Sequence, residues 1–215
     1  MVAGYTKLLG KRYSGKLDSN ADEFIAFAVD GATRMQALIN DLLSYARVTR
    51  KAREFEAIEG EKVVDRALAN LHRSLADSGA TVTRDPLPTL RGDATQLVQV
   101  FQNLIGNALK FRADGPVAVH VGASRQEDGW QFSVRDNGIG IDPKYMDQLF
   151  ILFRRLHSRA EYPGTGIGLA IVRKAVQRMG GQMGLESEPG RGSKFWIELP
   201  SAAQAQAQEP VQRAA

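Results

Sequence analysis

The sequence lacks cysteine, a long apolar run and the marks of a leader. With no cysteine among its 215 residues, a disulfide scaffold and a zinc site built on thiolates are both excluded. No apolar run approaches the roughly 18 residues that span a bilayer, and the start lacks a basic region followed by an apolar core. We therefore expect a cytoplasmic chain, with no membrane contact by this segment.

Dense blocks of positive charge are also missing. The net charge is +4 and the isoelectric point is near 9.4, values that can indicate nucleic-acid binding. The basic residues are nevertheless spread among acids, and no Lys/Arg block has interleaved aromatic residues. We expect no nucleic-acid partner. The length suffices for one core of ordinary size and a smaller element.

Residues 1–52 have the apolar spacing of two helices. The first stripe ends near Ser14 and Gly15, and Asp18 can cap the second helix. Apolar residues in the second helix recur at three- and four-residue steps, at Phe24, Phe27, Met35, Leu38, Leu42 and Tyr45. Such a seam packs against a partner helix, within one domain or in a second copy. We favour a helical hairpin that forms a homodimeric four-helix bundle, because ~50 residues alone bury little surface.

Residues 53–200 are predicted to form a second domain, joined to the first through the polar stretch 47–61. One helix should run from Val63 to its stop at Gly79, and Asp93 should cap another. Further helices are expected at 143–152 and 166–179, and strands at 80–84, 117–121, 130–134, 183–188 and 194–199. This order predicts an α+β fold, a two-layer sandwich whose mixed sheet is covered on one face by helices. The Ala/Gln-rich residues 201–215 are predicted to be disordered.

The first of three polar and glycine-rich clusters contains Asn103, Asn107 and Lys110. Their i, i+4, i+7 spacing places them on one helical face. Asparagine disfavours helix interiors, so the pair is either exposed polar surface or functional. An amide oxygen suits Mg²⁺, and a lysine can meet phosphate as a point charge.

The second cluster begins with Asp136 at the end of a predicted strand and continues through Gly138 and Gly140. A buried carboxylate needs a donor, and the amino group of adenine is a suitable one. The glycines would let the backbone approach a base closely. Asp-Asn-Gly is also a common turn sequence, which leaves a purely structural alternative.

The third cluster, Gly164 to Gly168, opens a predicted helix. Glycines at a helix N-terminus create an anion site from free amides. A dinucleotide-binding fold is disfavoured because no strand immediately precedes the loop. The stretch from Phe150 and Phe153 through Arg154 and Arg155 could cover a bound nucleotide as a lid, although the phenylalanines also suit an ordinary core.

The ordered clusters resemble the asparagine box, the two glycine boxes and the intervening phenylalanine box of sensor histidine kinases. The wider superfamily includes gyrase-type, Hsp90-like and mismatch-repair ATPases, and the resemblance covers about residues 59 to 200. The runs FRRLH at 153–157 and EYPGTGIGL at 161–169 further resemble phytochrome-like bacterial kinases. The helix from Phe24 to Arg47 looks like part of their dimerisation and phosphotransfer domain.

This resemblance implies ATP and Mg²⁺ as cofactors. It implies that Asn107 holds Mg²⁺ and that Asn103 supports it. Lys110 would contact phosphate, Phe111 would contact the base, and Asp136 would accept from adenine. Further residues that would shape, support or cover the nucleotide site are Gly138, Gly140, Phe153, Arg154, Arg155, Gly164, Thr165, Gly166, Gly168, Leu169 and Ser193.

The sequence departs from the kinase pattern at the phosphoacceptor. The three histidines, His72, His120 and His157, lack the context of the family's acceptor, which lies on the first helix of the hairpin. We therefore expect Mg-ATP binding without self-phosphorylation, in a chain shortened at its start or naturally lacking the acceptor, and we assign no catalytic residue.

Three functions remain open. The first is the catalytic portion of a kinase that phosphorylates a histidine elsewhere, for relay to a response-regulator receiver domain. The second is a dimerising module that binds nucleotide and regulates a kinase or response regulator. A stand-alone ATPase is disfavoured because Asn103 stands where water-using relatives carry a glutamate base.

Overall fold

The computed structural model describes residues 1–50, 55–158 and 161–200. They divide into two compact units, Met1–Ala46 and Arg47–Ala215. The predicted disordered tail, 201–215, lies outside the described residues. No described helix is both long and apolar enough to cross a membrane.

The first unit is a helical hairpin. Helix α1 spans Val2–Tyr13 and helix α2 spans Ser19–Arg50. Gly15, with φ of 69°, makes the turn, and its amide donates to the Asp22 carboxylate. As predicted, Asp18 caps α2 by accepting from the Ala21 amide at 2.8 Å.

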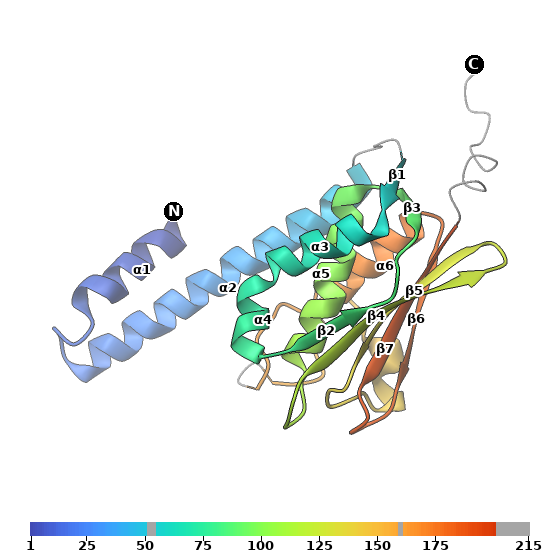
Figure 1. Ribbon diagram of the computed structural model, residues 1–215. Coiled ribbons are helices and arrows are strands. Elements are labelled where there is room, and N and C mark those ends of the chain that lie inside the picture. The colour runs from blue at the N-terminus through green and yellow to red at the C-terminus, as the bar shows by residue number, and fades with distance from the viewer. Residues whose placement is uncertain (51–54, 159–160, 201–215) are drawn as a thin grey trace, which may run out of the picture. The chain divides into compact units, whose positions relative to one another are not determined.

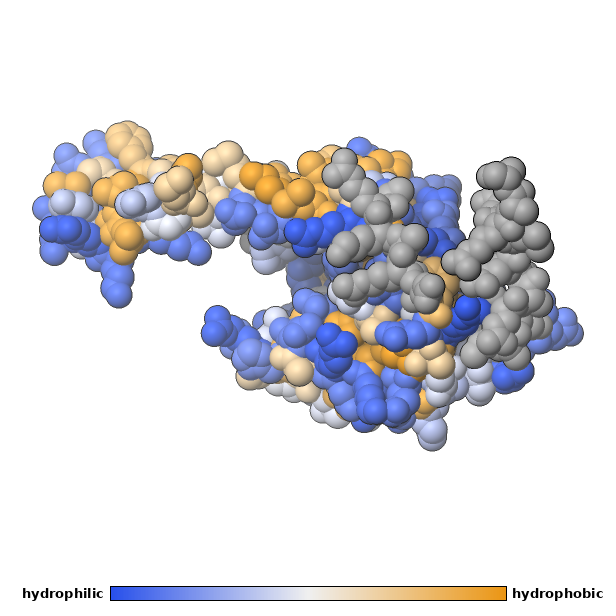
Figure 2. Space-filling view, turned by 90° about the horizontal axis from the view of Figure 1, so that it is seen from above, coloured by the Kyte–Doolittle hydropathy of each residue, from blue (hydrophilic) through white to orange (hydrophobic). Residues whose placement is uncertain are grey.

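The hairpin exposes much of its apolar surface. No residue of α1 is buried. Figure 2 shows hydrophobic residues on the surface of this unit. On α2 the side chains of Phe24, Phe27 and Met35 are 69%, 63% and 55% exposed. An apolar stripe of this kind stabilises a helix only when another surface covers it.

The second unit is built from a sheet with helices on one face (Figure 1). Its elements are β1 (Glu56–Glu59), α3 (Gly60–Asn70), α4 (His72–Ser78), β2 (Thr81–Arg84), β3 (Thr89–Gly92), α5 (Ala94–Lys110), β4 (Ala118–Gln126), β5 (Gly129–Asp136), the 3-10 helix η1 (Pro143–Gln148), α6 (Gly168–Arg178), β6 (Gln182–Ser187) and β7 (Ser193–Pro200). The large sheet has the order β2-β4-β5-β7-β6, with β2 and β4 parallel and the other pairs antiparallel. The predicted α+β sandwich is confirmed.

Alternation along the strands separates the two faces of this sheet. On β5, Phe132 and Val134 are buried, while Gln131, Ser133 and Arg135 point the other way. Helix α5 covers the buried face, and its Phe101 ring meets Phe132 edge-on with centroids 6.1 Å apart. Asp93 caps α5 as predicted, accepting from the amides of Thr95 and Gln96. The core therefore fixes the rotation of α5.

Several local predictions are wrong. The helix expected from Val63 to Gly79 is two helices, because the chain unwinds at Leu71, whose φ of −96° and ψ of 6° are not helical. Residues 143–152 form only the short η1. Strands β1 and β3 were not predicted, and they pair antiparallel with Ile58 opposite Leu90. Each has four residues with one strongly apolar side chain facing inward, which is too little for a sequence signal.

Candidate nucleotide site

Helix α5 presents the first cluster on one face. Asn103, Asn107 and Lys110 are half-buried, whereas Leu104 and Ile105 on the opposite face are fully buried in the core. The predicted separation of these three polar residues from the core face of the helix is confirmed. The rotation that buries the apolar stripe therefore turns both amides and the ammonium toward the same region.

The second cluster lies against the C-terminal end of α5. The Ile139 amide donates to the carbonyl oxygen of Phe111 at 3.0 Å. A Cβ atom on Gly138 would lie 2.2 Å from that oxygen, so only glycine allows this approach. At Gly140, φ is 67° and a Cβ atom would lie 2.0 Å from the Glu188 carbonyl oxygen, so this position also requires glycine.

Asp136 ends β5 beside these glycines, as predicted. Its Oδ1 accepts from the amides of Gly138 at 2.9 Å and Ser193 at 3.1 Å. Burial raises the pKa of the Asp136 carboxyl, and the two backbone hydrogen bonds oppose that rise. Within the described chain, no donor reaches Oδ2. The carboxylate is therefore fixed through one oxygen and offers the other as an acceptor.

The third cluster closes on the same face of α5. A Cβ atom on Gly164 would lie 3.2 Å from Nζ of Lys110, and one on Gly168 would lie 2.7 Å from Oδ1 of Asn103. Gly166 has φ of 76° and would place a Cβ 2.7 Å from the Arg154 carbonyl oxygen. These close approaches bring the first and third clusters together, and the positive φ angles of Gly164 and Gly166 favour glycine at those two positions.

The start of α6 carries the remaining predicted residues of this cluster. The Thr165 hydroxyl accepts from the Ile167 amide at 3.4 Å, and Leu169 is half-buried in the first turn. The first amides of α6 lack acceptors within the helix, as at any helix N-terminus. They form, with Lys110, a region suited to negative charge.

The segment between η1 and α6 contacts both α5 and the glycines. Phe153 is 55% exposed with φ of 65°, which is uncommon for a residue other than glycine. It is not part of the core, the alternative considered for it. Arg154 donates to Gln148, and Arg155 donates to the carbonyl oxygens of Ser158 and Tyr162. Nη1 of Arg155 is buried and has no partner among the described residues.

Three aromatic rings gather at this segment. Ring centroids of Phe111, His157 and Tyr162 lie 5.0 to 5.9 Å apart. Nζ of Lys110 lies 4.0 Å from the Phe111 centroid. Burial, with a smaller effect of the nearby Arg155 charge, lowers the pKa of Lys110 to about 8. Periodicity gave no role to His157 or Tyr162, because loop residues lack a repeating signal.

The side-chain oxygens that could bind a hard cation at this site are the amide oxygens of the asparagines on α5. No group of three or more His, Cys, Asp or Glu side chains in the described part of the chain could hold a metal ion. Asn103 donates from Nδ2 to the Gln99 carbonyl oxygen at 2.9 Å, which directs its Oδ1 toward Gly168. Asn107 lies one turn nearer the C-terminus of α5. Amide oxygens of this kind suit Mg²⁺ completed by phosphate and water oxygens.

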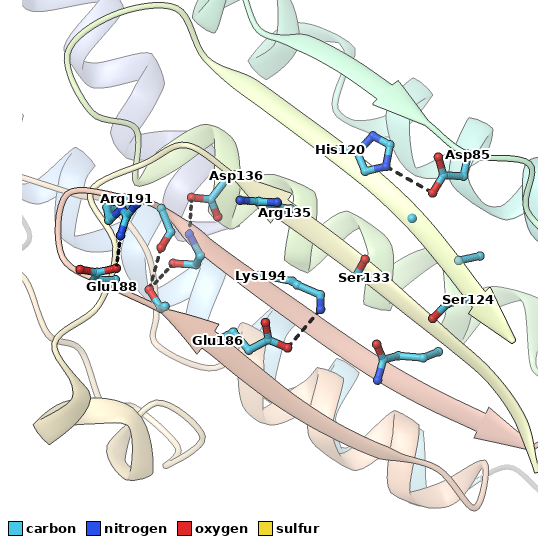
Figure 3. Close-up of a pocket in the computed structure, with 16 residues that line it drawn as sticks. Asp85, His120, Ser124, Ser133, Arg135, Asp136, Glu186, Glu188, Arg191 and Lys194 are labelled. Carbon is cyan, nitrogen blue, oxygen red and sulfur yellow. Dashed lines mark hydrogen bonds and ion pairs between the residues drawn. The ribbon is translucent and has the colours of Figure 1, made fainter. Parts of the chain in front are cut away.

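A second hollow, of about 710 Å³, lies over the sheet face that the helices leave open (Figure 3). Several of its polar side chains pair with one another. Asp85 lies 3.3 Å from His120, Glu186 lies 3.1 Å from Lys194, and Glu188 pairs with Arg191. Such satisfied pairs are typical of a solvated sheet face. Asp136, Ser187 and Ser193 line the end of this hollow, whereas none of Asn103, Asn107 and Lys110 does.

Comparisons with known proteins identify the family of this chain. Residues 92–203, just over half of the chain, match the family model of histidine kinase-, DNA gyrase B- and HSP90-like ATPases. The chain is 51% identical over 199 residues to cyanobacterial phytochrome A of Nostoc sp., covering 93% of this chain and 26% of the relative. It is 47% identical to phytochrome-like protein Cph1 of Synechocystis sp., covering 93% and 27%.

A solved structure shows the same fold. The crystal structure of full-length ShkA in complex with AMPPNP has a TM-score of 0.70 and 30% identity, covering 93% of this chain and 42% of ShkA. This chain spans only about a quarter of the length of both phytochrome relatives. It belongs to the histidine kinase-, DNA gyrase B- and HSP90-like ATPase family, as the ATP-binding catalytic domain of a phytochrome-like two-component histidine kinase.

Proposed function

We propose that this chain binds Mg-ATP between the polar face of α5, the loop after β5 and the segment leading into α6. It then transfers the γ-phosphoryl group to a histidine that lies outside this chain, for relay to a response-regulator aspartate. The convergence of all three clusters on α5 carries this proposal. It is supported by the contacts of Phe111 with Ile139, Lys110 with Gly164, and Asn103 with Gly168.

In this mechanism the residues bind and orient the nucleotide. Asp136 accepts from the adenine amino group through Oδ2. Asn107 would hold Mg²⁺, which neutralises charge on the phosphates when bound. Lys110 and the first amides of α6 position the phosphates. A histidine ring nitrogen attacks the γ-phosphorus, the bond to the bridging oxygen breaks, and ADP leaves.

Transfer to a histidine is favoured over hydrolysis by the groups that surround this site. Asn103 is an amide that cannot act as a general base toward water. Residues 1–50 contain no histidine. Elsewhere, His72 contacts the Ala69 carbonyl oxygen, His120 lies on β4, and His157 belongs to the aromatic group. None of the three lies on the hairpin, where the resemblance places the acceptor of the family.

A transfer assay tests this function. The chain is mixed with γ-labelled ATP and Mg²⁺, alone and with a histidine-bearing hairpin fragment of a phytochrome-like kinase that has no ATP domain. We expect acid-labile label on the fragment and none on this chain. Label on this chain would contradict the missing acceptor, and steady phosphate release would indicate an ATPase. ATP binding without transfer would favour the regulatory module.

We also propose that the hairpin dimerises. The apolar side chains of Phe24, Phe27 and Met35 are exposed along α2. The hairpin of a second copy would cover them in a four-helix bundle. Phe27→Glu should lower the mass measured by light scattering from dimer to monomer, whereas the control Glu23→Gln should keep the dimer. A wild-type monomer at all concentrations would exclude this interface.

Lys110 gives the site a pH signature. Its lowered pKa of about 8 leaves the amine half-protonated at that pH, and a bound phosphate favours the charged form. ATP binding near pH 8 should therefore take up about half a proton. Affinity should fall as the pH rises through this value. Calorimetry in two buffers of different ionisation enthalpy measures the uptake.

The controls for this prediction are two methionine variants. Lys110→Met should abolish the proton uptake and weaken binding, while Lys16→Met, at an exposed lysine, should change neither. Equal uptake in wild type and Lys110→Met would remove Lys110 from the phosphate site. In the free protein the unfolded chain holds this proton more tightly between pH 8 and 10.5. The Lys110 contribution to unfolding free energy therefore rises with pH across that window.

A further inference from the structure

Ser187 is a hydroxyl with three hydrogen-bond neighbours. It ends β6 directly opposite Ser193 of β7. Its Oγ accepts from the Ile141 amide at 2.9 Å, lies 2.9 Å from the Gly192 carbonyl oxygen and lies 2.9 Å from Oγ of Ser193. It therefore joins the loop after β5, the β6–β7 turn and the first residue of β7.

The valence of a hydroxyl determines the direction of each bond. Ser187 has one hydrogen and two lone pairs. The Gly192 carbonyl can only accept, so it takes the Ser187 hydrogen, and the Ile141 amide can only donate. The remaining lone pair of Ser187 must then accept from the Ser193 hydroxyl. Ser193 is left without a hydrogen to donate elsewhere, so its Oγ acts only as an acceptor toward any other group.

Ser193 lies beside the proposed base-recognition carboxylate. It is 7% exposed and on the helix-covered face at the end of β7, and its amide donates to Oδ1 of Asp136. Neighbouring residues on one face of paired strands lie within reach of a common ligand. Asp136 and Ser193 thus present two acceptors and no side-chain hydrogen at this end of the site.

We propose that Ser187 is a specificity-determining positioning residue, which selects adenine over guanine by holding Ser193 as an acceptor. This inference rests on the proposed function, in which the base lies at Asp136. The adenine amino group carries two hydrogens and can donate one directly to each acceptor. The guanine carbonyl oxygen in the same place would face both acceptors without a hydrogen between them.

The test compares ATP and GTP affinities by calorimetry. In Ser187→Ala the Ser193 hydroxyl is free to rotate and donate to a carbonyl. The preference for ATP over GTP should therefore fall by about tenfold, the scale of one neutral hydrogen bond. Ser187→Thr, which retains the hydroxyl, should keep the wild-type ratio. An equal loss of affinity for both nucleotides in Ser187→Ala would show a merely structural role and overturn the proposal.

A double-mutant cycle guards against a folding defect. In a Ser193→Ala background, Ser187→Ala should leave the ATP-to-GTP ratio unchanged, because no hydroxyl remains to be oriented. A further drop in the ratio there would also overturn the proposal. The variant Asp136→Asn distinguishes a failure of the proposed function from a failure of the role of Ser187. If Asp136→Asn leaves the ATP affinity unchanged, the base does not lie at Asp136 and the proposed function fails. If Asp136→Asn weakens ATP binding but Ser187→Ala leaves the ATP-to-GTP affinity ratio unchanged, only the role of Ser187 is refuted.

Discussion

Replacing Asp136 with asparagine is expected to weaken ATP binding by about 10- to 150-fold, the loss of one hydrogen bond to a charged group worth about 1.5–3 kcal/mol. The amides of Gly138 and Ser193 both donate to Oδ1, so the asparagine oxygen must take that place. Its NH₂ group then replaces Oδ2 and meets the adenine amino group donor to donor. The local fold keeps its two backbone hydrogen bonds.

Calorimetry with ATP measures this effect, and Asp77→Asn, an exposed acid on α4, is the matched control. The control should bind as the wild type does. Unchanged affinity in Asp136→Asn, with the protein folded, would show that the carboxylate does not meet the base.

The raised pKa of Asp136 adds a pH dependence with a defined sign. A protonated carboxyl is a weaker acceptor, so wild-type affinity should fall as the pH drops toward the raised pKa, and Asp136→Asn should lack this fall. For stability the sign is opposite. The folded state holds this proton more tightly than the unfolded chain, so the contribution of Asp136 to unfolding free energy falls as pH rises above its ordinary value of 3.8 through the raised pKa.

Phe101→Ala should lower the unfolding free energy of the second unit by about 3–5 kcal/mol. Phe101 is 1% exposed and packs edge-on against Phe132, so truncation leaves a cavity between α5 and the sheet. The two tryptophans, Trp130 and Trp196, both lie on strands of that sheet. Their fluorescence in a urea titration therefore reports the second unit without interference from the hairpin.

Tyr145→Ala, at a 37% exposed ring on η1, is the control and should change the unfolding free energy by less than about 0.5 kcal/mol. A loss below 1 kcal/mol in Phe101→Ala would mean that α5 is not held by this core contact. The consequence for function is direct, because the same helix rotation presents Asn107 and Lys110. A variant that remains folded should still show weaker ATP binding.

Short-range physics made the helix face and the caps predictable. The i, i+4, i+7 spacing places Asn103, Asn107 and Lys110 together on any α-helix, whatever surrounds it. Asp93 caps α5 because a carboxylate immediately before a helix finds free amides within three residues. The alternation of β5 likewise predicts that Asp136 ends a half-buried strand.

The spacing of apolar residues could not predict contacts between segments that are distant in the sequence. Ile58 pairs with Leu90 in β1 and β3, although neither strand carries enough apolar residues to be recognised alone. The split at Leu71 is equally invisible, because the apolar spacing continues through it. The gathering of His157 and Tyr162 around Phe111 depends on how the loop returns to α5.

The amino-acid sequence alone thus indicates which residues share a helix or strand face and have side chains suited to a nucleotide, since helical and strand periods are properties of the local backbone. Only the folded arrangement reveals that Ser187 links Ile141, Gly192 and Ser193, because these partners approach from three directions through the pairing of β6 with β7. Hydrogen-bond direction follows from the complete set of neighbours around a hydroxyl. That set of neighbours exists only once β6 has paired with β7.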